Sequence, residues 1–570
     1  MQLKGLKNRA YNVLFHTHTV AGIVLSVMLF VIFYAGAFSI FRHDIHQWED
    51  PEARILNSGY YDVDRAISEV DSLYNLDFVQ STNIIFPTED DPFLKVYGAT
   101  RHIDDGDSLP HIERMGAAVV PISYQVKDIF NPKTTLGSTI YVLHYFGQIP
   151  IVGLYISGFT ALFFLFATIT GVLIHWRNLF TKFYAFIKEG KWKTIWTNAH
   201  TVLGMIGLPF QVIYAITGAF FGLLTLVLAP TVLLLYDGDA SKVFNQINPE
   251  NGIVLDENAA DANNISLNIL YEQVKAEYPE TGVAGVLIRN YGKEDALATW
   301  RLNGEGVLSS GTAVMYMRDG IILDEYSNSP KEISYSQSVI NLISKLHFAN
   351  FGGIFLRLIY FVLAMITCFM ILSGVLIWRT ARDNNKYTFR QRTFHHRVTK
   401  VYLAISMSMF PAFAIIFLAN KFVPLEINGR IDLVNQIFFI SWLALIILGL
   451  FWNNYSKLNR NYLFLGGILS IFIPLANGLV TGDWFWKTFE SLPKVMYVDI
   501  FWTFTGLTAL ILVLFILDVK KGTDKPQPAL ENKKRETSVV EERPLFKKPR
   551  PSINKPTPHL AINSTKGRTE

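Results

Sequence analysis

Eight stretches of this chain are apolar over lengths that can cross a membrane as a helix. About 20 helical residues are needed to span a hydrocarbon core of ~30 Å. The stretches are residues 19–41, 149–174, 201–235, 351–378, 399–419, 433–452, 461–480 and 499–517. The first is too long for the apolar region of a signal peptide and lacks a small-residue cleavage site, so we expect an uncleaved anchor. The pattern predicts a mainly α-helical polytopic membrane protein with about eight transmembrane helices.

Basic residues gather in every second connection between these stretches. Lys and Arg are enriched in the loops that stay in the cytoplasm. The alternation therefore predicts that both termini are cytoplasmic and that the intervening connections lie outside. The basic residues are Lys4, Lys7 and Arg9; Arg177, Lys182, Lys188, Lys191 and Lys193; Arg379, Arg382, Lys386, Arg390, Arg392, Arg397 and Lys400; Lys457 and Arg460; and Lys520 and Lys521.

Two long connections, residues 42–143 and 237–346, fall on the predicted outer face. Both are mixed polar segments with strand-like runs, such as STNIIFP and VAGVLIRN, and we expect each to form a small α+β domain. Residues 519–570 have no apolar period, which is typical of a disordered extension. The expected segments are 1–41 (N-terminus and first span), 42–143 (first outer domain), 144–236 (second and third spans), 237–346 (second outer domain), 347–380 (fourth span), 381–518 (last four spans) and 519–570 (tail).

Composition agrees with membrane residence. Half of the 570 residues are hydrophobic and only 17% are charged, which is fewer charged residues than a soluble protein of this length usually carries. The single cysteine, Cys368, excludes an internal disulfide, an iron–sulfur cluster and a cysteine-type zinc site. The basic residues follow the predicted inner loops, so nothing suggests nucleic-acid binding.

The chain contains an internal repeat that includes histidines. HTVAG at residues 18–22 matches HTVLG at 200–204, and a second glycine follows each histidine by eighteen residues, at Gly36 and Gly218. His144 and His347 each precede a further glycine by twenty-seven residues, within TGVLIHWR and SGVLIWRT. The unit of helix, outer domain and helix thus occurs twice, which predicts an internal duplication.

The predicted topology places these four histidines in two layers. His18 and His200 lie near the cytoplasmic edge, and His144 and His347 lie near the outer edge. If the halves pack about a pseudo-two-fold axis, each layer offers the two imidazoles that a bis-histidine haem iron needs. Gly22 and Gly204 lie on the same helical face as the preceding histidine and would let a porphyrin approach the backbone. The alternative is that such histidines lie at headgroup level and that the glycines only allow helices to pack.

Other histidines are weaker candidates. His175 lies at the cytoplasmic edge but aligns with Trp378 in the repeat. His395 or His396 could replace His200 or bind a further haem, although both could also be ordinary interfacial residues. His43 and His46, just beyond the first span, could contact a haem propionate or a substrate at the outer side.

As a set, the H-x-x-x-G opening, the TG near the helix end, LH, and TGVLIHWR resemble the PepSY-associated transmembrane (PepSY-TM) family. The resemblance covers about residues 10–380. It implies PepSY-like outer domains in the periplasm and b-type haem on His18, His144, His200 and His347. Because members include bacterial inner-membrane ferric-siderophore reductases, it also implies electron transfer to a ferric chelate, for iron uptake. The last four spans receive no role from it.

No glycine-rich dinucleotide fingerprint is present, so we expect a separate cytoplasmic protein or a quinol as electron donor. An ion-coupled transporter would carry carboxylates within its spans, whereas Asp432 and Asp499 lie only at their borders. Structural zinc needs four converging ligands, and each layer offers two. A non-enzymatic PepSY-type sensor or regulator is the alternative function.

Overall fold

The structure is a computed structural model of the chain. It describes residues 8–51, 61–88, 91–102, 111–129, 132, 134–176, 192–256, 258–304, 310–329, 335–452, 454–489, 491 and 493–516. The predicted tail, 519–570, lies outside the described residues, as do most of the basic residues of the connection 177–191.

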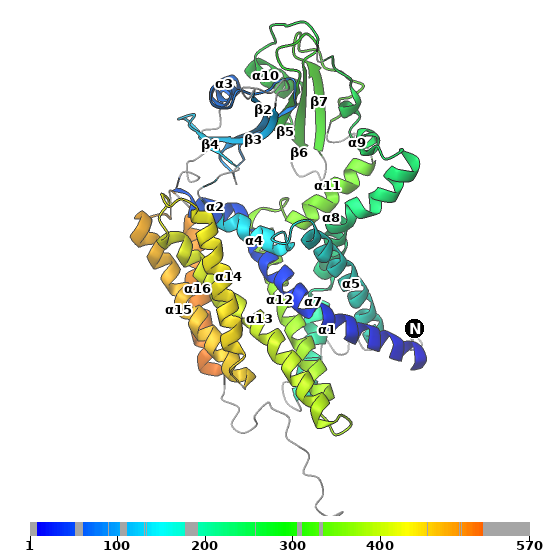
Figure 1. Cartoon of the computed structure of the whole chain (residues 1–570), viewed down its shortest axis with the longest axis vertical. Helices are drawn as coiled ribbons and strands as arrows, with labels where there is room; N and C mark the ends of the chain where they lie inside the picture. The colour runs from blue at the N-terminus through cyan, green and yellow to red at the C-terminus, as the bar shows by residue number, and fades with distance from the viewer. Residues whose placement is uncertain are drawn as a thin grey trace, which may run out of the picture. The chain divides into compact units, whose positions relative to one another are not determined.

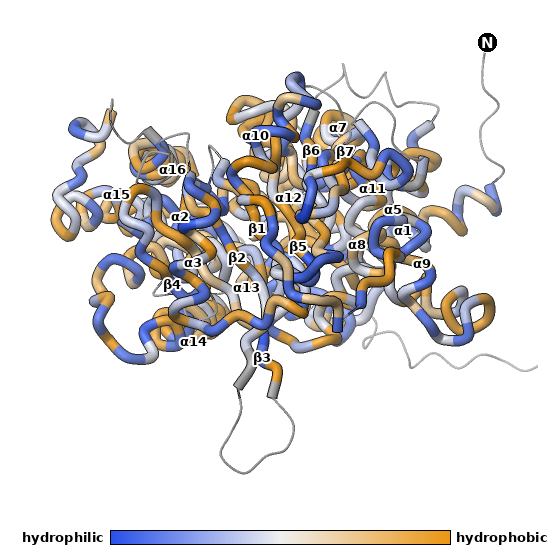
Figure 2. The backbone as a smooth tube through the Cα atoms, turned by 90° about the horizontal axis from the view of Figure 1, so that it is seen from above, coloured by the Kyte–Doolittle hydropathy of each residue, from blue (hydrophilic) through white to orange (hydrophobic). Residues whose placement is uncertain are grey.

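Eight helices among the described residues are long and apolar enough to cross a membrane, which confirms the predicted count (Figure 1). Figure 2 shows hydrophobic residues recurring along these helices. The helices are α1 (Asn8–Ser39), α5 (Val152–His175), α8 (Leu208–Leu235), α12 (Gly353–Arg382), α13 (Phe389–Phe422), α14 (Arg430–Gly449), α15 (Tyr455–Thr481) and α16 (Pro493–Phe515).

The third predicted span differs from a single helix. It consists of α7 (Trp192–Ile206), which carries His200, and α8, with a break at Gly207. Pro209 has no N–H group and favours the first turn of a helix, so it starts a new helix here. A Cβ atom added at Gly207 would lie 2.6 Å from Nε2 of Gln211, so only glycine fits this break without displacing that side chain.

Short helices connect the spans to the strands. They are α2 (Arg42–Glu49) after α1, α4 (Leu136–His144) before α5, α9 (Ala240–Ile247) with the 3₁₀ turn η3 (Pro249–Gly252) after α8, and α11 (Tyr335–Phe348) before α12. Two of them end in candidate histidines, because His144 is the last residue of α4 and His347 the penultimate residue of α11.

The strands of both long connections join one seven-stranded antiparallel sheet, in the order β4-β3-β2-β1-β5-β6-β7. At its centre β1 pairs with β5, with Ile84 opposite Val286. We expected a separate α+β domain from each segment, whereas hydrogen bonding continues from one segment into the other. The strands are β1 (Thr82–Ile85), β2 (Leu94–His102), β3 (His111–Val119), β4 (Val126–Asp128), β5 (Thr281–Arg289), β6 (Leu297–Gly304) and β7 (Ser310–Tyr316).

Two helices, α3 (Val63–Tyr74) and α10 (Leu267–Glu277), pack against the sheet, and their apolar sides share one core with it. Val70 of α3 and Val274 of α10 are fully buried in this core, as are Ile84 and Trp300 of the strands. Each segment contributes one helix followed by a run of strands, so the order of elements is the same on both sides of the β1–β5 pair.

The first turns of α3 and α10 cap one another. The carboxylate of Asp64 accepts hydrogen bonds from the backbone N–H groups of Leu267 (2.9 Å) and Asn268 (3.2 Å). In return, Oδ1 of Asn268 accepts one from the backbone N–H of Val63 (2.8 Å). Helix N-termini have free N–H groups and a positive dipole end, so each helix supplies what the other requires. The caps therefore tie the two segments together.

We expect Asp64→Ala to loosen α10 as well as its own helix, because it exposes the amides of Leu267 and Asn268. Loss of one such cap costs about 0.5–2 kcal/mol. Hydrogen exchange on the full-length protein should show faster exchange in residues 267–277. Asp64→Asn, which keeps an acceptor, should restore most of the protection, and Asp261→Ala, which removes an exposed carboxylate, should change nothing there. Unchanged protection of α10 in Asp64→Ala would show that the cap does not stabilise this helix.

Candidate functional site: two histidine pairs

The structure brings His18 of α1 together with His200 of α7. The ring centres are 6.2 Å apart and the ring planes meet at 76°. Each histidine is the first residue of one copy of the repeated pentapeptide. The predicted inner pair is therefore close in space.

Each ring of this inner pair is fixed by a hydrogen bond from Nδ1 to the backbone of a facing helix. Nδ1–H of His18 donates to the carbonyl of Ala167 in α5 (2.9 Å), and Nδ1–H of His200 donates to the carbonyl of Met370 in α12 (2.9 Å). A hydroxyl lies beside each ring at the matching position, on Thr170 (3.4 Å) and Ser373 (3.2 Å). Ala167 precedes Met370, and Thr170 precedes Ser373, by the same 203 residues that separate His144 from His347.

The predicted outer pair, His144 and His347, also meets. The ring centres are 6.0 Å apart with an interplanar angle of 44°. Nδ1–H of His144 donates to the carbonyl of Ile32 in α1 (2.8 Å). Nδ1 of His347 is 2.8 Å from the hydroxyl of Thr217 in α8, and that hydroxyl donates its own proton to the carbonyl of Ile213. The Thr217 oxygen is thus left to accept from His347.

These hydrogen bonds determine which ring nitrogen is available. A carbonyl oxygen can only accept, so Nδ1 must carry the proton and the lone pair belongs to Nε2. Among the described residues no hydrogen-bond partner faces Nε2 of any of the four histidines. A fixed Nδ1–H with an unused Nε2 is the usual arrangement of a metal-binding histidine.

The ring spacing suits one metal atom between each pair. An imidazole nitrogen binds a transition metal at about 2.0–2.1 Å. The centre of the ring lies roughly 1.2 Å behind that nitrogen, so two rings on opposite sides of one metal would have centres about 6.4 Å apart. The observed 6.2 and 6.0 Å are close to this distance. The separation of the ring centres in each pair is therefore compatible with two imidazoles that share one metal atom.

Both histidines of the outer pair line a cavity of about 330 Å³. Ligand cavities in proteins usually measure about 300–1,000 Å³ and are mostly apolar. No charged side chain lines this one, and its polar groups are the two imidazoles, Ser157 and three tyrosine hydroxyls. The lining residues are Leu29, Ile32, Phe33, Gly36, Ala37, Ile40, Tyr141, His144, Tyr145, Leu154, Ser157, Ala161, Phe164, Phe210, Tyr214, Gly218, Phe221, Gly222, His347, Phe348 and Ala364.

The glycines of the repeat have two different surroundings. A Cβ atom added at Gly22 or Gly204 would meet nothing within 4 Å, so both border open space near the inner pair. A Cβ atom added at Gly36 would lie 2.7 Å from Nδ1 of His144. The open space is compatible with a flat ligand beside Gly22 and Gly204, whereas Gly36 makes room for a histidine ring.

Two further glycines act in the same way as Gly36. A Cβ atom at Gly171 would lie 3.1 Å from Cε1 of His18, and one at Gly374 would lie 3.2 Å from Cε1 of His200. Gly171 and Gly374 are the glycines of TGVLIHWR and SGVLIWRT. In the sequence they served only to define the repeat, and their contacts with the inner histidines were not predicted. The available signal was their offset of 203 residues, which equals that of His144 and His347 and marks them as equivalent positions.

The two pairs are separated along α1. His144 binds the carbonyl of Ile32, which lies fourteen residues after His18. At a rise of 1.5 Å per residue this corresponds to about 21 Å. Aromatic rings pack beside the outer pair: the ring centre of Phe33 lies 6.2 Å from that of Phe210, which lies 4.5 Å from that of Tyr214, and the ring centre of Tyr214 lies 5.1 Å from that of His347. The pairs therefore form two layers within one bundle of helices.

The histidines of lower rank lie elsewhere. His175 is the last residue of α5 and lies near His200. His395 packs edge-on against Trp378 with ring centres 4.9 Å apart. His396 is buried, and its Nδ1 is 2.7 Å from the hydroxyl of Tyr455. The structure gives neither His395 nor His396 a place in the two pairs.

His43 and His46 belong to α2 and face carboxylates, and neither is among the residues that line the cavity. Nδ1 of His43 lies 4.0 Å from Asp91, and Nδ1–H of His46 donates to Glu49 (3.4 Å). Burial lowers the pKa of His46, but the bond to Glu49 and the nearby carboxylates of Asp50 and Asp91 raise it above its ordinary value. These histidines make structural contacts rather than facing the outer pair.

No group of three or more His, Cys, Asp and Glu side chains in the described part of the chain could hold a metal ion. Cys368 is buried and reduced. The two histidine pairs, each with two nitrogen ligands, are what the described residues offer to a metal-containing cofactor.

Comparison with known proteins finds one family. The family described as "PepSY-associated TM region" matches residues 15–381. The match begins just before His18 and ends within α12, so it includes both histidine pairs and both segments of the sheet. The helices α13 to α16 lie beyond it. No curated protein matches the chain.

Replacing Gly36 by alanine should displace His144. The added methyl group would lie 2.7 Å from Nδ1, too close for any real contact, and would force the ring away from Ile32. Overpacking of this kind typically costs about 1–3 kcal/mol, which should appear as a lower melting temperature of the protein purified without a cofactor. Gly22→Ala is the matched control, since its methyl group would enter open space. Equal melting temperatures for the two variants would contradict the close approach at Gly36.

Proposed function

The chain belongs to the PepSY-associated TM family, and from this premise we propose that it is a b-type haem protein that moves electrons across a membrane. Its substrate would be ferric iron held by a siderophore or a similar chelator, reduced in the periplasm of a bacterial cell. About two haems would bind, one to each histidine pair.

One observation carries this proposal. Four histidines far apart in sequence form two pairs, and each ring has Nδ1 fixed and Nε2 available. A sensor or regulator built on the sheet would have no use for two such pairs inside a bundle of helices. Ionisable side chains are costly in that environment, so they are rare there and mark functional sites.

We infer further that the two halves arose by duplication. The inner histidines bind equivalent carbonyls of equivalent helices, and the sheet has the same sequence of elements on either side of the β1–β5 pair. A pseudo-two-fold relation of this kind brings one histidine from each half into each layer. The outer pair departs from it at one point, since Thr217 replaces a backbone carbonyl as the partner of His347.

The orientation follows from the distribution of basic residues. We propose that both termini and the basic connections face the cytoplasm, so that the chain is a multi-pass protein of the inner membrane. The sheet, with its two PepSY-like segments, would then face the periplasm, and His144 and His347 would lie nearer to it. A cytoplasmic protein or a quinol would supply electrons to the inner side.

Each part of the site would contribute a physical task. A haem bound between a histidine pair would supply one-electron transfer at a potential set by its ligands and surroundings. The carbonyls of Ala167, Met370 and Ile32 hold the imidazoles in the correct tautomer and orientation. The apolar lining of the outer cavity excludes water, and Tyr214 secures α11 by donating from its hydroxyl to the carbonyl of His347 (2.9 Å).

Reduction would release iron without breaking the chelator. Fe(II) carries less charge and is softer than Fe(III), so oxygen-donor chelators hold it more weakly. The protein would therefore need to deliver an electron to the bound chelate and would need no hydrolytic residues.

A reduced-minus-oxidised visible spectrum of the purified protein tests the proposal directly. We expect a low-spin b-type spectrum with about two haems per chain, as two bis-histidine sites require. His144→Ala or His347→Ala should remove roughly half of the haem and abolish ferric reduction, while the inner haem remains. A colourless preparation from cells supplied with haem would contradict the proposal and would favour the alternative, a non-enzymatic sensor.

Alanine at Gly204 separates cofactor binding from folding. Its methyl group meets no protein atom within 4 Å, so the melting temperature of the haem-free protein should be unchanged. If a porphyrin occupies that space, the same methyl group should reduce the haem content of the inner site. An unaltered haem content would show that no cofactor lies beside Gly204.

A further inference from the structure

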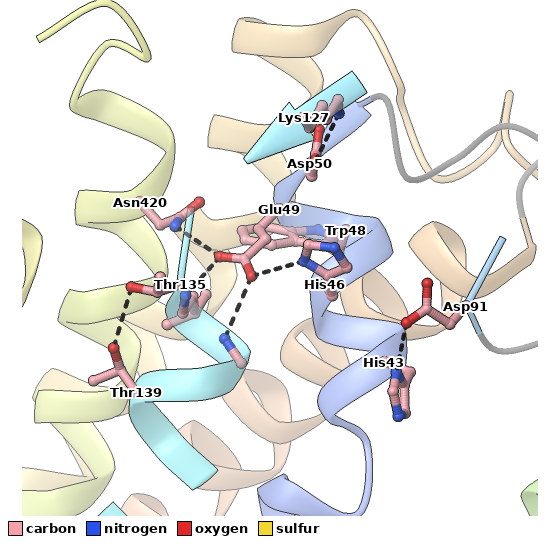
Figure 3. Close-up of polar contacts among 12 residues, drawn as sticks. His43, His46, Trp48, Glu49, Asp50, Asp91, Lys127, Thr135, Thr139 and Asn420 are labelled. Carbon is pink, nitrogen blue, oxygen red and sulfur yellow. Dashed lines mark hydrogen bonds and ion pairs between the residues drawn. The ribbon is translucent and has the colours of Figure 1, made fainter. Parts of the chain in front are cut away.

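The short helix α2 makes buried polar contacts with α4, α13 and α16. Half of its eight residues are buried, namely Asp44, Ile45, Trp48 and Glu49. Figure 3 shows Asn420 and His46 beside the carboxylate of Glu49. It follows α1 directly and packs against α4, whose last residue is His144. Carboxylates and an indole in such a position need partners, and these partners identify what α2 does.

Glu49 caps α4. Its carboxylate accepts hydrogen bonds from the backbone N–H groups of Leu136 (2.7 Å) and Gly137 (3.5 Å), the first two residues of that helix. The carboxylate of Glu49 also accepts from the side-chain amide of Asn420 in α13 (3.2 Å) and from His46 (3.4 Å). A buried negative charge is stable here because it meets free N–H groups at the positive end of a helix dipole.

The first residue of α2, Arg42, also contacts α4. The backbone carbonyl of Arg42 lies against Gly137, where an added Cβ atom would be 2.9 Å from that oxygen. The guanidinium of Arg42 lies 4.8 Å from the ring centre of Tyr141 on the next turn of α4. Because α4 has only nine residues, contacts at Leu136, Gly137 and Tyr141 position His144 together with the packing of α4 against α1.

The helices α13 and α16 contact α2 directly, and α15 supports α16. The ammonium group of Lys421 in α13 donates to the backbone carbonyl of Trp48 (2.6 Å) and lies over its indole ring. The indole N–H of Trp48 donates to Asp499 of α16 (2.8 Å), whose second oxygen accepts from Asn477 of α15 (2.8 Å). Lys421 and Asp499 are both buried.

The helix α14 reaches α4 itself. The hydroxyl of Thr139 in α4 donates to the side-chain carbonyl of Asn435 (2.9 Å). Three of the four helices beyond the family match, α13, α14 and α16, therefore contact α2 or α4 through buried or half-buried polar groups. The fourth, α15, supports Asp499 of α16. These contacts are directional, and leaving one partner unpaired costs about 1–3 kcal/mol.

We propose that Glu49 is a positioning residue for His144, acting through α4, and that α13 to α16 form the clamp that keeps Glu49 in place. The importance of that position rests on the function proposed above, in which His144 binds iron. The four helices that received no role from the sequence thereby acquire one. They fix the outer histidine of the first half.

Glu49→Ala tests this on the full-length protein in two ways. Hydrogen exchange of the haem-free protein should become about tenfold or more faster at Leu136 and Gly137, which lose their acceptor. The loss of protection should extend through α4 to His144. In the haem-loaded protein, the spin-state signature of the outer haem should change while that of the inner haem stays as in the wild type.

Two variants serve as controls. Glu49→Gln keeps an acceptor oxygen and should restore most of the protection and of the outer-haem spectrum. Glu250→Ala removes a buried carboxylate of η3 and should leave α4 and both haems unaltered. Loss of protection confined to Leu136 and Gly137, or an unaltered outer-haem spectrum, would overturn the positioning role. If the wild type binds no haem, the proposed function fails, and exchange at His144 alone decides whether Glu49 positions it.

Discussion

The hydrogen bond from Nδ1 of a histidine to the backbone of a neighbouring helix is the interaction on which the arrangement of this bundle depends. Within a bilayer an unsatisfied polar group is expensive, so each imidazole must find a partner. Ala167, Met370 and Ile32 supply backbone carbonyls, and Thr217 supplies a hydroxyl. These bonds orient the rings, set their tautomer and connect α1 to α5, α7 to α12, α4 to α1 and α11 to α8. Helix packing and ligand geometry are therefore parts of one network.

Close approach between helices makes that network possible. Gly36, Gly171 and Gly374 face histidine rings at distances that a methyl group would obstruct. Small residues serve this purpose generally in membranes, where apolar contact between helices gains little over contact with lipid. Beyond the bundle, the β1–β5 pair and the mutual caps of Asp64 and Asn268 join the two segments of the sheet. The two halves are thus connected both within the helices and outside them.

Much of this could be predicted from the sequence, because it depends on local periodicity. The eight spans follow from uninterrupted apolar runs, and the two pairs follow from repeated offsets around His18, His144, His200 and His347. The shared sheet could not be predicted in the same way, since strand pairing between Ile84 and Val286 depends on contacts 202 residues apart. The break at Gly207 and the cap by Glu49 were also missed. Neither residue belongs to a pattern that distinguishes it from other glycines or glutamates.

The central position of β1 has a consequence for how the chain is made. Its β5 neighbour lies about two hundred residues further on, beyond α5, α7 and α8. During synthesis the first four strands therefore emerge with one edge unsatisfied, and an open strand edge invites pairing with other chains. That edge closes only after two further membrane crossings have been inserted. The ribosome thus synthesises β5 long after β1, and the exposed edge of β1 must be shielded from other chains in the interval.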